Sequence, residues 1–247
     1  MKAMKKKAGA GRAAKRGKVQ DVEARLVTGL QSASEAERIA AAWALTCLAP
    51  RQWGEKLLSG SALQALGAAL AIRTMARDEP DVVVSLIGCL VKVLQNGAIR
   101  DGTDKKTRDG VRCLVAQALK HIARYAPNMV KAHDKHIAEA VRRFSGVRKD
   151  GAAALIYVNT LEWGVSMPEP FDEDIQLGVI EALQDLAERQ PAIVVPLTRR
   201  LADMLDSSSE VVRKGAAGVI STLAENILYG QLASRDAANL AHNDGKR

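Results

Sequence analysis

The sequence predicts an all-α protein, and three observations favour that fold class. Apolar side chains recur every three to four residues along most of the chain, which is the spacing of a helix with one buried face. Hydrophobic residues make up 47% of the 247 residues and aromatic residues only 3%, and the helix-favouring Ala and Leu dominate. The stretch from Leu201 to Ala224 places two apolar helices around an Asp-Ser-Ser-Ser turn.

The expected helices of the first third can be bounded in chain order. Residues 19–31 carry apolar side chains four apart. Ser34 then caps a helix with an acidic first turn, and Pro50 ends that helix. Residues 61–75 are again helical in pattern. The β-branched run of residues 81–94 resembles a strand, but its length favours a buried helix.

The later helices follow the same logic. Residues 103–126 form the longest candidate, which stops before Pro127. Residues 164–171 contain two prolines and are expected to form an irregular connection. Pro191 and Pro196 fall near the start of the helix before Leu201, where proline is tolerated in the first turn.

The second helix of the Leu201–Ala224 segment has a recognisable spacing. Arg213 is followed by Ala216, Ala217 and Leu223, and small residues at that distance let neighbouring helices approach closely. We therefore expect Ala217 to lie at a helix contact, where a larger side chain overpacks. Similar spacings start at other positions: Arg38, Arg112, Arg148 and Gln176.

This unit resembles a HEAT repeat of the HEAT/armadillo α-solenoid superfamily. The resemblance implies a right-handed α-solenoid of about five to six HEAT-like helical pairs over residues 19–229, although the marks are less evenly spaced than the family's repeats of roughly 40 residues. Residues 1–18 would precede it as a disordered basic tail, and residues 230–247 would follow as a polar tail.

Composition narrows the class of protein. No apolar run is long enough to span a membrane, and the basic N-terminus lacks the apolar stretch of a secretory signal. Cys47, Cys89 and Cys113 are odd in number and lack ligand-like spacing, which favours an intracellular location, cytoplasmic or nuclear. Cys47 and Cys89 lie in apolar runs and are expected to be small core residues.

Charge is unevenly distributed along the chain. Residues 1–18 hold eight cations and no acid, which equals the net charge of +8. Residues 100–150 carry 13 basic and 6 acidic residues, and residues 151–247 carry 8 and 14. Three interpretations of the tail remain open: a nucleic-acid contact, a targeting signal and a solubilising tail. Its clusters are Lys5, Lys6, Lys7, Lys15 and Arg16.

The central basic region is the main candidate binding site. On a helical wheel of residues 103–126, apolar side chains cover one arc and cations the adjacent arc. A groove lined by these cations would bind phosphates or an acidic protein segment; alternatively, they form a solvated face paired with nearby acids. The candidates are Lys105, Arg108, Arg112, Lys120, Arg124, Arg142, Arg143, Arg148 and Lys149.

Catalytic patterns are scarce, so we expect no enzyme and no cofactor. His133 and His136 are spaced to chelate a metal on a helix, but lysines flank them and no Cys lies near. One branch of HEAT-like proteins excises alkylated DNA bases with aromatic residues in a basic groove, and another includes phycobilin lyases. Here Trp43 and Trp163 lie within or at the end of apolar helices, where we expect core positions.

The sequence therefore favours a non-catalytic adaptor or scaffold whose groove binds an extended or helical segment of a partner protein. The alternative is a nucleic-acid or ribonucleoprotein component that uses the basic tail and the central basic helices. A HEAT-like DNA glycosylase is the weaker alternative.

Overall fold

In the computed structural model, residues 19–96, 104–166 and 172–244 are described, the last fifteen of them by backbone alone. Within these ranges the regular structure is helical throughout and contains no strand, which confirms the all-α prediction. The chain divides into two compact units, Met1–Ile122 and Ala123–Arg247. The predicted basic tail, residues 1–18, lies outside the described residues.

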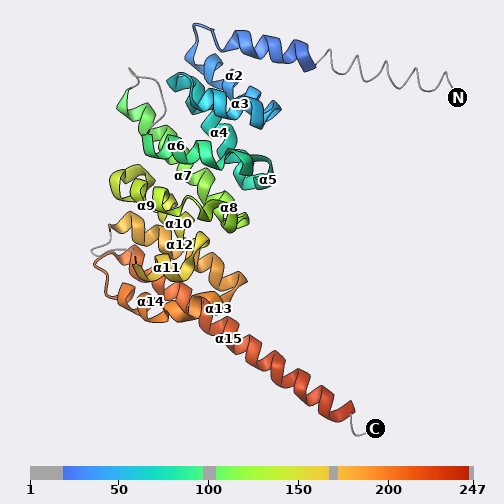
Figure 1. Ribbon diagram of the computed structural model, residues 1–247. Coiled ribbons are helices and arrows are strands. Elements are labelled where there is room, and N and C mark those ends of the chain that lie inside the picture. The colour runs from blue at the N-terminus through green and yellow to red at the C-terminus, as the bar shows by residue number, and fades with distance from the viewer. Residues whose placement is uncertain (1–18, 97–103, 167–171, 245–247) are drawn as a thin grey trace, which may run out of the picture. The chain divides into compact units, whose positions relative to one another are not determined.

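Unit 1 begins with a helix over residues 19–29. The helices that follow are α2 (Glu35–Leu48), α3 (Pro50–Leu58), α4 (Ala62–Asp78), α5 (Pro80–Val83), the 3-10 turn η1 (Val84–Leu86), α6 (Ile87–Asn96) and most of α7 (Lys105–Tyr125). The helix expected over residues 81–94 is thus broken in two by η1. Long α2 and α4 pack along each other, and short α3 packs against both (Figure 1).

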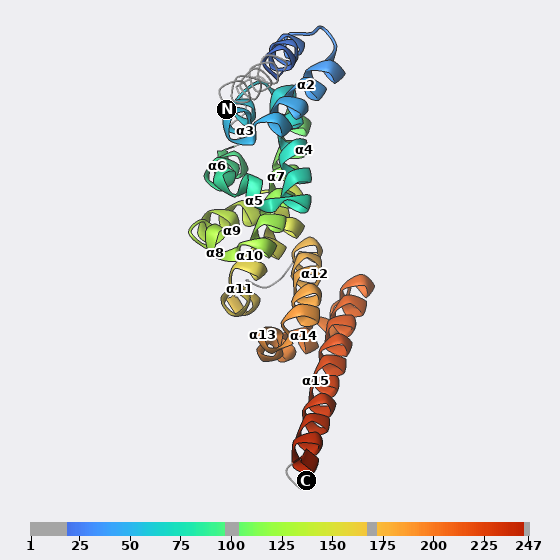
Figure 2. The same cartoon turned by 90° about the vertical axis from the view of Figure 1, so that its right-hand side faces the viewer.

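Unit 2 continues from the last turn of α7. Its helices are α8 (Pro127–Lys131), α9 (Asp134–Arg143), η2 (Ser145–Val147), α10 (Arg148–Val158), α11 (Thr160–Ser166), α12 (Glu173–Arg189), α13 (Pro191–Val194), η3 (Val195–Leu197), α14 (Thr198–Leu205) and α15 (Glu210–Asp244). Long α12 packs between α10 and α15, whereas the short helices α9 and α14 pack against α10 and α15 (Figures 1 and 2).

The same corner ends each of five long helices. The residue after the helix has φ between −133° and −154° and ψ between 63° and 89°, outside the helical region. In four cases proline follows as the first residue of a short helix, and its ring disfavours the helical conformation of the residue before it. In the fifth, Asn159 precedes Thr160, and the Asn159 side chain accepts a hydrogen bond from the backbone N–H of Glu162. These corners hold a long helix against a short one.

Glycines set the closest helix crossings. A Cβ added at Gly67 on α4 would overlap the carbonyl oxygen of Ile39 on α2, and one added at Gly178 on α12 would overlap that of Lys149 on α10. Both crossings therefore bring one helix onto the backbone of the next, and only glycine fits there.

These glycines belong to a succession of elements that occurs once in each unit. Matching positions fall in the same order along the chain: Arg38 and Arg148, Trp53 and Trp163, Gly67 and Gly178, and Pro80 and Pro191. Each tryptophan is followed by a glycine whose added Cβ would press on a leucine of a 3-10 turn, Leu86 in η1 or Leu197 in η3. Residues 34–94 and 145–205 thus share one local architecture.

The core of each unit is aliphatic. Fully buried side chains include Leu45, Ile72 and Leu90 in unit 1 and Leu155 and Leu183 in unit 2. In the last long helix, the small residues that contact the neighbouring helix lie one or two positions before the residue that the sequence predicts. Ala217 is exposed, whereas Ala216 is fully buried and a Cβ added at Gly215 would lie 2.7 Å from Ile180 of α12. The prediction for Ala217 was therefore wrong.

Candidate interaction surfaces

The predicted basic residues are spread over both units. Lys5, Lys6, Lys7, Lys15 and Arg16 lie outside the described residues. Lys105, Arg108, Arg112 and Lys120 lie on the unit 1 part of α7; Arg124, Arg142, Arg143, Arg148 and Lys149 lie in unit 2, on the end of α7 and on α9 and α10.

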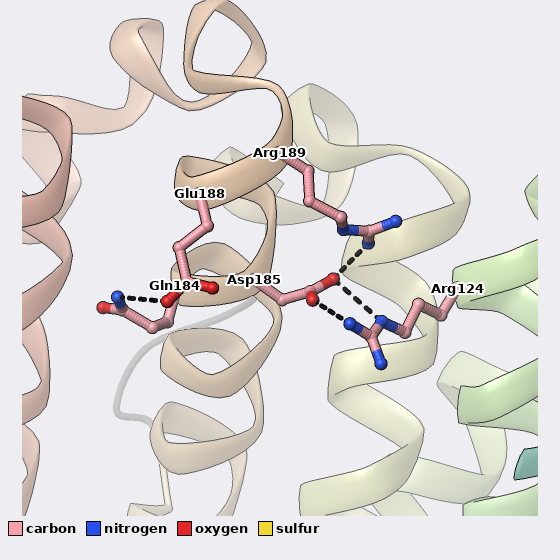
Figure 3. A network of polar contacts seen from close by, with 5 residues as sticks. All are labelled: Arg124, Gln184, Asp185, Glu188 and Arg189. Atoms are coloured by element: carbon pink, nitrogen blue, oxygen red, sulfur yellow. Dashed lines mark hydrogen bonds and ion pairs between the residues drawn. The ribbon is translucent and has the colours of Figure 1, made fainter. Parts of the chain in front are cut away.

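Arg124 belongs to a polar network with α12. Its Nε donates to Asp185 Oδ2 at 3.1 Å, its Nη2 donates to Asp185 Oδ1, and Arg189 donates to the same carboxylate (Figure 3). Gln184 donates to Glu188 on the neighbouring side of the helix at 3.1 Å (Figure 3). Asp185 is thus held between two guanidinium groups, and Arg124 has an intramolecular partner.

The network shifts the ionisation of its members. Burial by itself would raise the pKa of Asp185, but hydrogen bonds from Arg124 and Arg189 outweigh it and hold that pKa below its usual range. The hydrogen bond to Asp185 raises the pKa of Arg124. Burial, together with the negative charge of Asp185, raises the pKa of the Tyr157 phenol above its ordinary value. The network is therefore ionic and Tyr157 neutral at neutral pH.

Two further cations of unit 2 are paired with α12. Arg148 Nη1 contacts Asp172, the N-cap residue of α12, and Lys149 Nζ lies 3.3 Å from Glu181. The acids that make the last part of the sequence negative thus neutralise part of the central basic region. Arg124, Arg148 and Lys149 serve to join α10 and the end of α7 to α12.

Other predicted cations are more accessible. Arg142 and Arg143 are exposed at the end of α9, where the Arg143 guanidinium lies 5.2 Å from the centre of the Phe144 ring. Lys105 and Arg108 are exposed at the start of α7. Arg112 is different: its side chain is only 13% exposed and its Nη1 donates to Asp109 at 3.1 Å. It does not belong to a solvated cationic flank.

The most unusual surface of the described residues lies on unit 1. Trp43 is 43% exposed and Leu48 42% exposed, and Cys47 is exposed as well. The expectation that Trp43 and Cys47 are core residues was therefore wrong. Ala36 and Ala40 extend the same exposed stripe of α2 toward its start, since the residues at 36, 40, 43 and 47 recur at helical spacing.

Helix α4 extends this apolar stripe. Leu66 and Leu70 are half-buried, and Leu70 takes the position that Glu181 has on α12. Glu181 meets Lys149 across the α10–α12 crossing, so Leu70 lies beside α2 at the matching crossing. The α2/α4 face is defined here by Ala36, Ala40, Trp43 and Cys47 on α2 and by Leu66 and Leu70 on α4. Although the residue is exposed, partial covering of its sulfur raises the pKa of the Cys47 thiol.

The sequence of α2 contains a pattern that could have predicted this exposed apolar face. After Arg38, helix α2 is apolar on every side, in IAAAWALTCL. A helix of that kind either is surrounded by protein or presents a second apolar face. Periodicity predicts one buried face through Ala41 and Ala42, both of which are buried, but it does not distinguish a covered second face from an exposed one.

The Arg that marks each repeat has a partner in three of four cases. Arg112 donates to Asp109 and Arg148 to Asp172, and Arg213 Nη1 donates to the carbonyl oxygens of Ser207 and Ser208 at 2.7 and 2.9 Å. Arg38 is half-buried, its Nε is sealed from solvent, and its side chain makes no hydrogen bond or ion pair among the described residues. By helical spacing Arg38 lies on the same side of α2 as the buried Ala41 and Leu45, opposite the exposed stripe.

The remaining candidate chemistry is limited. The rings of His133 and His136 lie 6.4 Å apart between centroids, and no group of three or more His, Cys, Asp or Glu in the described part of the chain could hold a metal ion. Across those same residues, no helix combines the length and apolarity needed to cross a bilayer.

Comparison with known proteins assigns no family. No protein-family profile matches the chain, and a comparison with curated proteins finds no match.

Proposed function

We propose that this chain is a right-handed, HEAT-type α-solenoid that acts as a non-catalytic scaffold and binds an apolar segment of a partner protein on the α2/α4 face. The alternation of long and short helices within each unit supports the solenoid. Long helix α2 packs on α4, α10 packs on α12 and α12 packs on α15, and a corner joins each of five long helices to a short one, which is how stacked helical pairs bury their apolar faces.

The exposure of Trp43 carries the proposal. A tryptophan side chain buries up to about 250 Å² when it is fully covered, so leaving one half exposed on a rigid helix forgoes a large stabilisation. Such residues are enriched among the energetically dominant contacts of protein interfaces. The backbone N of Trp43 lies 3.1 Å from a Cβ added at Gly67, so Trp43 lies directly beside the crossing of α2 and α4.

The experiment is a selection of random displayed peptides on the immobilised full chain. Peptides recovered on the parent should bind at least tenfold more weakly to Trp43→Glu, since a charge replaces the proposed anchor. Leu161→Glu is the matched control, because Leu161 is 51% exposed on α11 of unit 2. Helicity of all three proteins is compared by circular dichroism. Equal binding to Trp43→Glu and the parent would refute this use of the face.

Exposed cations of α8 and α9 support a second candidate, a nucleic-acid component. Lys131, Lys135, Arg142 and Arg143 are exposed on this short segment. Cations that contact phosphates release counterions, so binding should fall steeply with salt. The test is a salt titration of RNA and DNA binding with the full chain, a variant lacking residues 1–18, and Arg142→Glu/Arg143→Glu. A shallow salt dependence that neither change alters would dismiss this candidate.

A further inference from the structure

We infer that the partner segment is an amphipathic α-helix, and that it packs on α2 in the place that a preceding long helix takes on α4, α12 and α15. The inference rests on the proposed function, because it specifies the form of the segment that the α2/α4 face binds. It starts from the sixth residue of each of these helices, which is a glycine in three of them and an alanine in α2: Gly67, Gly178, Gly215 and Ala40.

The sixth residue marks the side on which the preceding long helix lies. A Cβ added at Gly67 or Gly178 would overlap a backbone carbonyl of the preceding long helix, α2 or α10. One added at Gly215 would lie 2.7 Å from Ile180 of α12. Each of these helices therefore approaches the one before it through a small residue, which lets two helices pack closely.

On α2 the same side of the helix is uncovered. Its ninth residue, Trp43, matches Glu181 of α12, and Glu181 meets Lys149 of the preceding α10 at 3.3 Å. The exposed apolar residues of α2 recur at helical spacing around the sixth residue: Ala36, Ala40, Trp43 and Cys47. This stripe therefore continues the contact by which long helices pack on one another, and a helix with its own apolar stripe fits it.

The N-terminal residues of the chain do not supply that helix. The helix over residues 19–29 is fastened to α3 through the hydrogen bond from Trp53 to Glu23. A Cβ added at its Gly29 would lie 3.1 Å from Ala41, which is buried on the opposite side of α2 from the stripe. Residues 1–18 contain no Val, Leu, Ile or aromatic residue, so they lack the side chains of an apolar stripe.

The first test uses the peptides selected on the full chain, in which each central residue is replaced in turn by alanine and by proline. Positions that tolerate alanine make no essential side-chain contact. Proline at those positions should weaken binding roughly 100-fold, because it removes a helical hydrogen bond and clashes with the preceding turn. If proline is tolerated as well as alanine, the bound segment is not helical. The inference is then overturned, while dependence on Trp43 leaves the proposed function standing.

Cys47 allows a second test, because it is an exposed thiol within the stripe. Selected peptides with one cysteine at successive positions are equilibrated with the full chain in a glutathione buffer, and mixed disulfides are measured by mass spectrometry. A bound helix should give maxima three to four positions apart, whereas maxima two positions apart indicate an extended segment and contradict the inference. Cys47→Ser measures the background from the less exposed Cys89 and Cys113.

A third test concerns the position of the helix on α2. Ala40→Leu should weaken peptide binding at least tenfold, because the larger side chain fills the point of closest approach. Ala24→Leu is the matched control, since Ala24 is also exposed on a helix of unit 1, and it should leave binding unchanged. Helicity of both variants is compared by circular dichroism. Binding to Ala40→Leu as tight as to the parent would place the segment elsewhere and refute the inferred position.

A second copy of the chain is the competing occupant, and α15 is the helix that it could offer. Helix α12 contacts α15 through its first, eighth and twelfth residues, Glu173, Ile180 and Gln184. The residues at these places on α15 are exposed and polar or small: Glu210, Ala217 and Ser221. They provide no large apolar side chain to cover Trp43, which favours a separate partner.

Sedimentation over a range of protein concentrations distinguishes the two occupants. The inference expects a monomer at concentrations where the selected peptides bind. An oligomer that both Trp43→Glu and Ala40→Leu dissociate would assign the stripe to self-association and overturn the inference of a partner helix.

Discussion

Residues 34–94 of unit 1 and 145–205 of unit 2 share their corners and their glycine crossing but present different surfaces. In unit 2 the crossing is bordered by charge: Lys149 meets Glu181, and Asp185 lies between two arginines. In unit 1 the residues that match Glu181 and Asp185 are Leu70 and Thr74, and the Thr74 hydroxyl donates to the carbonyl of Leu70 within its own helix. One backbone thus supports either an internally paired surface or an apolar one that remains open.

A second difference concerns the short helices. Trp53 Nε1 donates to Glu23 Oε1 at 2.9 Å, which fastens the first helix to α3. The matching Trp163 has a buried Nε1 without a partner in the described residues. Each unit therefore satisfies polar groups that the other leaves unmet. Packing of apolar side chains thus determines where the helices lie, whereas polar side chains at a few positions determine which surface is available for a partner.

The largest expected contrast is between matched substitutions on α2 and α10. Ala153 takes the position of Trp43 and is fully buried. Ala153→Glu should cost more than about 4 kcal/mol of unfolding free energy, because it buries an unpaired charge. Trp43→Glu should cost less, about 1–3 kcal/mol, because it loses only the covered half of the ring and leaves the new charge in solvent. Urea denaturation followed by circular dichroism measures both. Similar costs would mean that the two positions are equally covered, against the difference in their exposure.

The glycine crossings come next. Gly67→Ala and Gly178→Ala should each destabilise the fold by about 2–4 kcal/mol, because the added methyl group overlaps a backbone carbonyl that cannot move without its helix. Gly88→Ala is the control: nothing lies within 4 Å of its added Cβ, so better helix propensity should stabilise α6 by up to about 1 kcal/mol. Denaturant midpoints of the three variants test the contrast. If only one of the two glycine substitutions destabilises the protein, the close helix contact is not shared by the two units.

The charged network of unit 2 should make stability depend on pH. The pKa of Asp185 is lower in the folded protein than its ordinary value of about 3.9. Its contribution is therefore fully present above that value and is lost as pH falls through the folded pKa. Asp185→Asn should cost about 1–2 kcal/mol at neutral pH, and the difference from the parent should shrink in acid. Thr74→Asn, the matching change in unit 1, should show no such pH dependence.

Sequence periodicity predicted the helices well, because proline corners and buried aliphatic spacing are local properties. Pro50, Pro80 and Pro127 each begin the helix that follows the predicted boundary. The surfaces were less predictable. Whether Arg148 is solvated or bound to Asp172 depends on a residue 24 positions away, and whether Trp43 is covered depends on which helices lie beside α2. The spacing of residues along one helix does not show which residues of other helices lie beside it. The paired cations and the exposed tryptophan could therefore be found only in the three-dimensional structure.

The smallest expected effect concerns the last long helix, where spacing alone selected the wrong alanine. Ala217 is exposed on α15, so Ala217→Leu should alter the unfolding free energy by less than about 0.5 kcal/mol. Ala216, one residue earlier, is fully buried, and Ala216→Leu should cost about 1–3 kcal/mol by overpacking the contact with α12. The glycine beside it, Gly215, fixes this register through its approach to Ile180. Comparing the two leucine variants by thermal melting therefore measures the rotation of α15 on α12. If Ala217→Leu lowers the melting temperature more than Ala216→Leu does, then Ala217 is the residue that faces α12. The register predicted from the spacing would then be correct.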